Sequence, residues 1–142
     1  MLFYRRFEER VNIAYTQQKF SGFCHLHIGQ EAVCVGVQAC LSSKDYVASG
    51  YRSHTQAIAK GIEAKAVLAE LFGRASGCSK GKGGSMHMFS SEKKFLGGQG
   101  IVGAQAPIAT GVAFACKYLD NNGICICYLG DAAMNQGAVY ES

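Results

Sequence analysis

The chain has 142 residues, 49% of them hydrophobic and 17% charged, which fits one ordinary α/β domain with a single core. Its formal net charge is +4, and the chain has no run of about five like charges, so we expect no nucleic-acid partner. Acidic and basic residues are mixed within the first ten positions, where a signal peptide would need an apolar stretch, so we expect no secretory signal peptide. No segment has the roughly 18 consecutive apolar residues of a membrane span, and we expect no membrane association.

The cysteines suggest neither a disulfide framework nor a metal site. There are seven of them, an odd number, and no Cys-x-x-Cys pair occurs. They are Cys24, Cys34, Cys40, Cys78, Cys116, Cys125 and Cys127. We interpret them as buried thiols in a reducing compartment.

The first half of the chain predicts three helices and one strand. Apolar residues at three- and four-residue steps indicate a helix over residues 2–15. Residues 28–41 are apolar-rich and helical in pattern, and residues 44–49 indicate a short strand. A longer helix is expected over residues 55–73, with its first threonine as the N-cap and its last glycine as the C-terminal stop.

The second half alternates glycine-rich segments with regular structure. Residues 73–84 carry five glycines and are predicted to form a loop, and residues 97–100 form a second glycine cluster. An alanine-rich helix is expected over residues 106–119. Residues 124–129 form a continuous apolar run, which predicts a strand buried on both faces of a parallel sheet.

Strands that alternate with helices predict a doubly wound, mostly parallel α/β sheet. The first residues already lie within a helix that has no capping residue, and residues 140–142 open another helix that has no stop signal. We therefore expect the natural polypeptide to continue. On this interpretation, residues 1–142 are the N-terminal part of a single domain that is truncated at its C-terminus.

Two candidate binding elements follow predicted strands, where ligands of doubly wound sheets bind. Tyr51 and Arg52 follow the first strand, and a phenol and a guanidinium can both address one phosphate group. Asp131 follows the last strand beside Ala132 and Ala133, so a carboxylate can hold a cation while backbone N–H groups hold phosphate oxygens. The alternatives are a surface arginine beside a packed tyrosine, and a simple Gly-Asp turn.

A histidine precedes the predicted helix over residues 28–41. The imidazole of His25 can donate a hydrogen bond or transfer a proton near neutral pH. A purely structural hydrogen bond is the alternative that this pattern leaves open.

Five segments carry a resemblance to a known family. They are HLHIGQEA (25–32), YRSH (51–54), GKGGSMH (81–87), GIVGAQ (100–105) and GDAAMNQG (130–137). In this order they resemble the alpha subunit of the decarboxylating component of pyruvate dehydrogenase. The preceding helix is also similar, so the resemblance covers nearly the whole chain and implies the thiamine-diphosphate-binding fold.

The resemblance implies thiamine diphosphate and magnesium as cofactors. The family positions that contact the cofactor match Tyr51, Arg52, Ser90, Gly100, Val102, Asp131, Ala132 and Ala133. By this implication, the first two hold the diphosphate and Asp131 is a magnesium ligand. His25 matches an active-site histidine near the reacting carbon, so it is the implied catalytic residue.

The sequence departs from the family pattern at the metal site. That pattern is Gly-Asp-Gly, followed further along the chain by an asparagine that completes the site, whereas Ala132 replaces the second glycine here and the sequence ends first. If Ala132 required a positive φ, it would be strained, but an ordinary φ leaves its N–H free. We therefore expect reduced rather than abolished diphosphate binding.

The implied activity is the oxidative decarboxylation of pyruvate, with transfer of the acetyl unit to a lipoyl group on an acyltransferase partner. A separate beta subunit supplies the acid that activates the cofactor in this family, which implies an α2β2 heterotetramer and an inactive fragment. Alternatives are an acetoin or branched-chain 2-oxo-acid dehydrogenase, or a non-catalytic assembly module of the same fold. The expected location is the bacterial cytoplasm, or the mitochondrial matrix or a plastid if the true N-terminus is missing.

Overall fold

A computed structural model describes residues 1–142 and contains one parallel sheet of three strands in the order β2-β1-β3. The central strand β1 (Tyr46–Gly50) lies between β2 (Phe95–Gln99) and β3 (Cys125–Cys127). Because the strands are parallel, their carboxyl ends meet at one edge, which the fold rule makes the ligand-binding edge. The parallel α/β architecture predicted from the sequence is confirmed.

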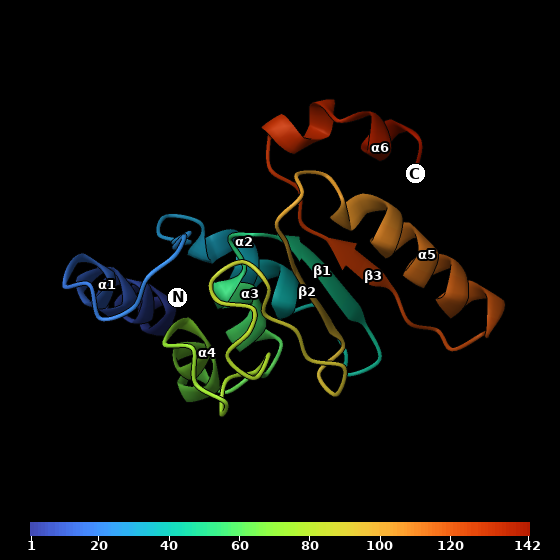
Figure 1. The fold of residues 1–142 in the computed structure, drawn as a ribbon. Coiled ribbons are helices and arrows are strands. Elements are labelled where there is room, and N and C mark those ends of the chain that lie inside the picture. The colour runs from blue at the N-terminus through green and yellow to red at the C-terminus, as the bar shows by residue number, and fades with distance from the viewer.

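Helices cover both sides of this sheet. They are α1 (Leu2–Thr16), α2 (Glu31–Gln38), α3 (His54–Ala59), α4 (Ala64–Leu71), α5 (Gln105–Tyr118), the 3-10 helix η1 (Ala132–Asn135) and α6 (Gly137–Tyr140). Figure 1 shows α5 beside β3 on one side of the sheet and α1 to α4 on the other. None of these helices combines the length and the apolar composition needed to cross a membrane.

The main core lies between the sheet and the helices that precede β2. It includes Val47 of β1, Phe95 of β2, Ala57 of α3 and Val67 of α4, all at most 1% exposed. The predicted strand over residues 124–129 is shorter than expected and only half-buried. The physical reason is its place at the edge of the sheet, where it has a strand neighbour on one side only.

The single long helix predicted over residues 55–73 is wrong, because the chain forms α3 and α4 instead. Gly61 adopts a φ of +103°, its N–H donates to Ile58, and the N–H of Ile62 donates to Ala57, which is a Schellman termination. The expected N-cap is also wrong, because Thr55 lies inside α3. The stop at Gly73 is confirmed by its φ of +64°.

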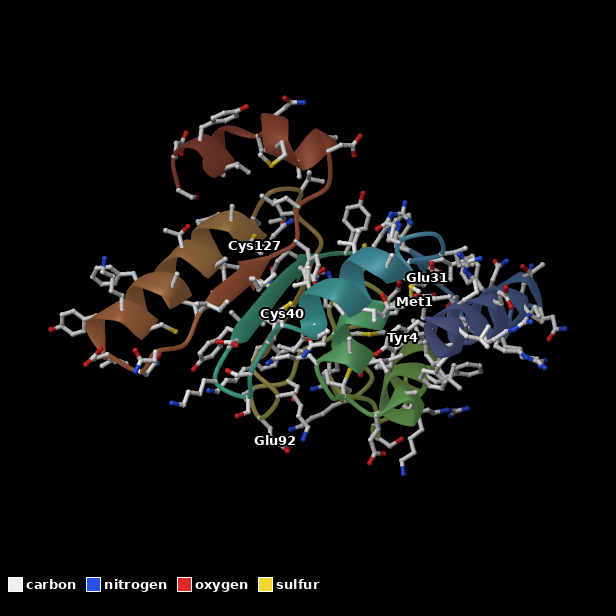
Figure 2. All side chains as sticks on the ribbon, turned by 180° about the vertical axis from the view of Figure 1, so that it is seen from behind. Met1, Tyr4, Glu31, Cys40, Glu92 and Cys127 are labelled. Carbon is white, nitrogen blue, oxygen red and sulfur yellow. The ribbon has the colours of Figure 1, made fainter.

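Helix α2 begins three residues later than the sequence pattern suggests. Gly29 has a φ of +94°, which a continuous helix does not allow. Glu31 then starts the helix and accepts hydrogen bonds from the Gly29 N–H at 3.1 Å and from Arg5 at 2.6 Å. Figure 2 shows Glu31 where α1 and α2 meet.

Strand β2 occupies the segment that the sequence presents as a glycine cluster. Glycine has low strand propensity, so residues 97–100 gave no strand signal. The structure explains the composition, because a Cβ added at Gly98 would lie 2.5 Å from the Met86 carbonyl oxygen and 2.6 Å from Oγ of Ser53. Glycine is therefore required here by close packing inside the sheet.

Candidate functional site

A cavity of about 500 Å³ opens at the carboxyl edge of the sheet. Its wall is formed by the residues that follow β1 and β3, together with the segment that connects β2 to α5. Six residues singled out from the sequence line it: Tyr51, Arg52, Val102, Asp131, Ala132 and Ala133. The structure thus brings together groups that are up to 82 positions apart in the chain (51 to 133).

Side chains of opposite charge line this cavity. Asp131 is the one carboxylate of the lining, and Arg52 is its one guanidinium. Nη1 of Arg52 donates to the Leu26 carbonyl oxygen at 2.9 Å, and its guanidinium carbon lies 5.8 Å from the ring centre of Tyr51. One hydrogen bond occupies only part of the guanidinium, so N–H groups remain for an anion. The structure contains no group of three or more His, Cys, Asp or Glu side chains that could hold a metal ion. Within the cavity lining, Asp131 is the one acidic side chain that can bind a cation.

Backbone N–H groups add further donors at the same edge. No acceptor in the protein receives the N–H groups of residues 100–103 or of residues 131–133. Ala132 is the first residue of η1 and is not among the residues with a positive φ. Alanine therefore replaces glycine at this position without backbone strain, and its N–H stays free.

A buried acceptor without a partner also belongs to this lining. Gln105, at the start of α5, is 2% exposed, and its Nε2 donates to the Tyr128 carbonyl oxygen at 3.0 Å. Its Oε1 has no hydrogen-bond partner in the protein. Because an unpaired buried polar atom is costly, this oxygen fits a ligand that carries a hydrogen-bond donor.

His25 lies beside the cavity without lining it. Its ring centre is 4.4 Å from that of Tyr51, and the two rings are tilted by 49°. Burial lowers the pKa of His25, and the positive charge of Arg52 lowers it further. The neutral imidazole is therefore favoured near pH 7, as a hydrogen-bonding group next to the cavity requires.

A second histidine lines the cavity and was not singled out from the sequence. His27 is 2% exposed, its Nδ1 is hydrogen-bonded to Oγ1 of Thr55, and its Nε2 lies 3.0 Å from Nε2 of Gln56. The amide of Gln56 donates, so Nε2 of His27 accepts and Nδ1 carries the proton. Burial lowers the pKa of His27. The alternation His25-Leu26-His27 was the available signal, since residues two apart share a face in extended chain.

Besides His25, two residues implied by the resemblance do not line the cavity. Gly100 lies between Gln99 and Val102, which both do. Ser90 forms a two-way backbone bridge with Phe95 at the amino end of β2, opposite the cavity. The position of Ser90 therefore does not support a contact with the cofactor. The cofactor contacts of both residues stay predictions.

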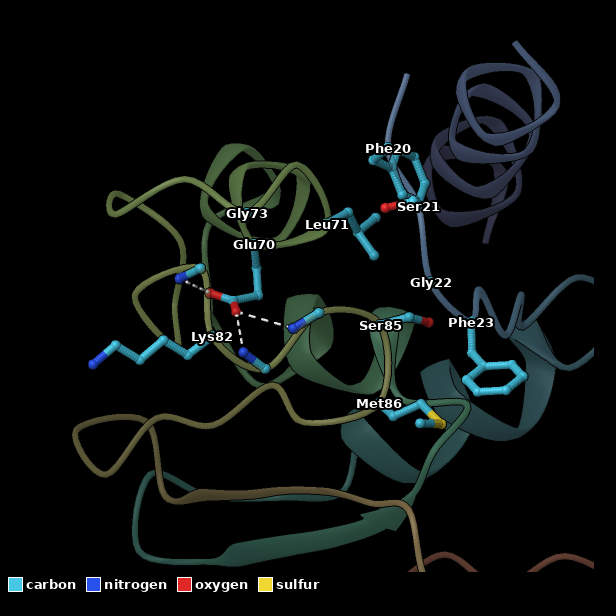
Figure 3. A pocket seen from close by; sticks show the side chains of 13 residues that line it. Phe20, Ser21, Gly22, Phe23, Glu70, Leu71, Gly73, Lys82, Ser85 and Met86 are labelled. Atoms are coloured by element: carbon cyan, nitrogen blue, oxygen red, sulfur yellow. Dashed lines mark hydrogen bonds between the residues drawn. The ribbon is translucent and has the colours of Figure 1, made fainter. Parts of the chain in front are cut away.

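A second, smaller cavity of about 260 Å³ lies beside the other glycine-rich loop. The fully buried carboxylate of Glu70 accepts four backbone N–H groups there, from Ser79, Gly81, Gly83 and Gly84, at 2.7–3.1 Å. Figure 3 shows the bonds to Glu70 from the loop residues that line this cavity; Ser79 lies outside the lining and is not drawn. The loop therefore already holds an anion that belongs to the chain itself, and its N–H groups are not available to a ligand.

Comparison with known proteins gives a consistent picture. A family described as the dehydrogenase E1 component matches residues 1–142. The chain is 58% identical to the pyruvate dehydrogenase E1 component subunit alpha of Zymomonas mobilis subsp. mobilis and 56% identical to that of Rickettsia bellii. It is 49% identical to the testis-specific mitochondrial form from Homo sapiens. These matches cover 100% of the chain but 40%, 44% and 36% of the relatives, so the chain spans about two-fifths of their length.

Proposed function

The chain belongs to the dehydrogenase E1 component family, and we propose that it acts as the N-terminal part of the alpha subunit of pyruvate dehydrogenase. The complete enzyme would decarboxylate pyruvate oxidatively and transfer the acetyl unit to a lipoyl group. The observation that carries this proposal is the cavity at the carboxyl edge of the sheet, where Arg52 and Asp131 stand among free backbone N–H groups.

Membership of this family implies dependence on thiamine diphosphate. The residues present fit that group, because Arg52, Tyr51 and the N–H groups of residues 131–133 are the donors that a diphosphate needs. The unpaired Oε1 of Gln105 supplies an acceptor for a donor elsewhere on the ligand. We propose Mg²⁺ as the accompanying ion, since Asp131 offers the hard oxygen that it prefers.

Each of these residues has a separate task in the proposed site. When bound, thiamine diphosphate supplies the electron sink for the loss of carbon dioxide. Arg52 binds and orients the negative end of the ligand, and Asp131 holds the cation beside it. His25, neutral and held against Tyr51, would donate or accept a hydrogen bond at the substrate oxygens.

The proposed partners follow from the same assignment. We propose a beta subunit that completes an α2β2 heterotetramer and supplies the acid that activates the cofactor. An acyltransferase with a lipoyl group would receive the acetyl unit. The named relatives do not favour the acetoin or branched-chain alternatives, and the unstrained Ala132 removes the main structural reason for a non-catalytic module.

The test is a substrate comparison on the full-length alpha chain assembled with its beta subunit. Turnover should be largest with pyruvate, require thiamine diphosphate and Mg²⁺, and be smaller with acetoin and branched 2-oxo acids. A preference for acetoin or a branched 2-oxo acid would move the protein to that substrate class. Cofactor binding without turnover of any of these substrates would refute the proposed activity.

A further inference from the structure

Three buried side chains form one hydrogen-bonded row that links α1 and α3 to the loop before β2. Both carboxylate oxygens of Glu8 lie 3.1 Å from Nδ1 of His54, and Nε2 of His54 lies 2.7 Å from Oγ of Ser85. Glu8 and His54 are 0% exposed and Ser85 is 5% exposed. None of the three lines the cavity at the carboxyl edge. Burying a carboxylate is costly unless it is paired, and His54 is its partner here.

The row ends on the backbone of His25. Oγ of Ser85 accepts the His25 N–H at 3.0 Å. A carboxylate only accepts, so Nδ1 of His54 donates to Glu8. When the His54 ring is neutral, its Nε2 then accepts the hydroxyl proton of Ser85. The Ser85 oxygen is then left to accept from His25.

Three further hydrogen bonds hold the residues that follow His25. Arg52 donates to the Leu26 carbonyl oxygen, and the His27 ring is held between Thr55 and Gln56. Three consecutive residues of this segment, 25–27, are therefore tied to residues 52–56 or, through Ser85, to the row. The segment has no regular secondary structure of its own, so these bonds are what define its position.

The order Glu-His-Ser is also that of serine hydrolases, in which the serine oxygen attacks a substrate. Here that oxygen accepts a backbone N–H from the same chain, and the serine is almost fully buried. Ser85 borders the smaller cavity of about 260 Å³, but an attacking oxygen must be free, and this one already accepts a hydrogen bond within the chain. The geometry therefore favours support of His25 over nucleophilic chemistry.

We propose that Ser85, oriented by His54 and Glu8, is a positioning residue that fixes the backbone of His25 and thereby holds its ring against Tyr51. The effect on catalysis rests on the proposed function of His25, whereas the effect on the backbone does not. The proposal also explains why α1 carries a fully buried glutamate, since Glu8 sets the direction of the row.

The experiment compares Ser85→Ala with Ser53→Ala in the full-length heterotetramer. Ser53 is the matched control, because its hydroxyl is equally buried but has no hydrogen-bond partner. Hydrogen exchange of a peptide that covers residues 23–29 should be about fivefold faster or more in Ser85→Ala, since one hydrogen bond is lost. With pyruvate, kcat should fall about tenfold at a nearly unchanged KM, because His25 is displaced rather than removed.

Ser85→Thr keeps the hydroxyl and should restore both slow exchange and kcat. Exchange in Ser85→Ala that equals that of Ser53→Ala would overturn the proposal, as would labelling of Ser85 by a fluorophosphonate, which marks a nucleophilic serine. An unmodified enzyme that does not turn over pyruvate would refute the proposed function alone. The exchange comparison would still decide the role of Ser85 in that case.

Discussion

Two segments of the chain are rich in glycine, residues 79–84 and residues 97–103. They differ in whether their backbone N–H groups have an acceptor within the protein. In the first segment, four N–H groups converge on the carboxylate of Glu70 within 3.1 Å. In the second, the N–H groups of residues 100–103 have no acceptor in the protein, and two of these residues line the large cavity. Glycine content therefore does not identify the ligand-binding loop.

The presence of an internal anion is what separates the two segments. A concave array of N–H groups attracts negative charge in either case. Glu70 supplies that charge from α4, so the first loop is a structural element that stabilises the fold. The second segment has no such side chain, so its free donors and the adjacent Arg52 are available to a bound anion. Stability and ligand affinity should consequently respond to different substitutions.

The largest effect is expected at Glu70. Glu70→Ala leaves four N–H groups without their acceptor, and we expect it to lower the free energy of unfolding by about 3–4 kcal/mol. Glu70→Gln keeps one oxygen and should cost roughly half as much. Urea unfolding of the full-length protein measures both. A Glu70→Ala variant as stable as the wild type would show that the loop does not depend on this carboxylate.

Two glycines of the same loop separate steric clash from backbone strain. A Cβ added at Gly81 would lie 2.6 Å from the Gly73 carbonyl carbon, whereas one added at Gly84 meets nothing within 4 Å. Both have a positive φ, +75° and +61°. Gly81→Ala should therefore cost about 2–3 kcal/mol and Gly84→Ala about 1 kcal/mol, the strain alone. Equal losses in thermal unfolding would mean that the loop relaxes around the added methyl group.

Substitutions in the large cavity beside the second segment should change ligand binding rather than stability. Arg52→Ala removes a charge-assisted hydrogen bond and should weaken binding of thiamine diphosphate by about 1.5–3 kcal/mol at any Mg²⁺ concentration. Asp131→Asn keeps an oxygen ligand but loses its charge, so excess Mg²⁺ should partly restore binding. Calorimetric titration of the heterotetramer distinguishes them. If excess Mg²⁺ rescued both variants equally, Arg52 and Asp131 would not have the separate roles proposed here.

The sequence predicted the parallel sheet and placed Tyr51, Arg52 and Asp131 at its carboxyl edge, because strand tips in this architecture converge on one site. It did not predict that Gln105 and His27 join them, since their burial depends on contacts between distant segments. Strand β2 was missed because its glycines are selected by close packing and not by strand propensity. The break between α3 and α4 did leave a local signal, the Lys-Gly-Ile sequence at residues 60–62.

The smallest effect is a pH dependence that originates in the wall of the large cavity. Burial lowers the pKa of His27 from its ordinary value of 6.5, so the folded protein binds fewer protons than the unfolded chain below that pH. The free energy of unfolding is therefore highest above pH 6.5 and decreases as the pH falls toward the lowered pKa. For one histidine, the slope is at most about 1.4 kcal/mol per pH unit.

His27→Gln should reduce this slope between about pH 6.5 and pH 5, and urea unfolding at a series of pH values measures it. His87→Gln is the control for losing a histidine, because His87 is exposed and does not line the cavity. His25 contributes in the same direction, since its pKa is lowered too, so some slope should remain in His27→Gln and disappear in the double variant with His25→Gln. A slope that His27→Gln leaves unchanged would place the pH response outside the large cavity.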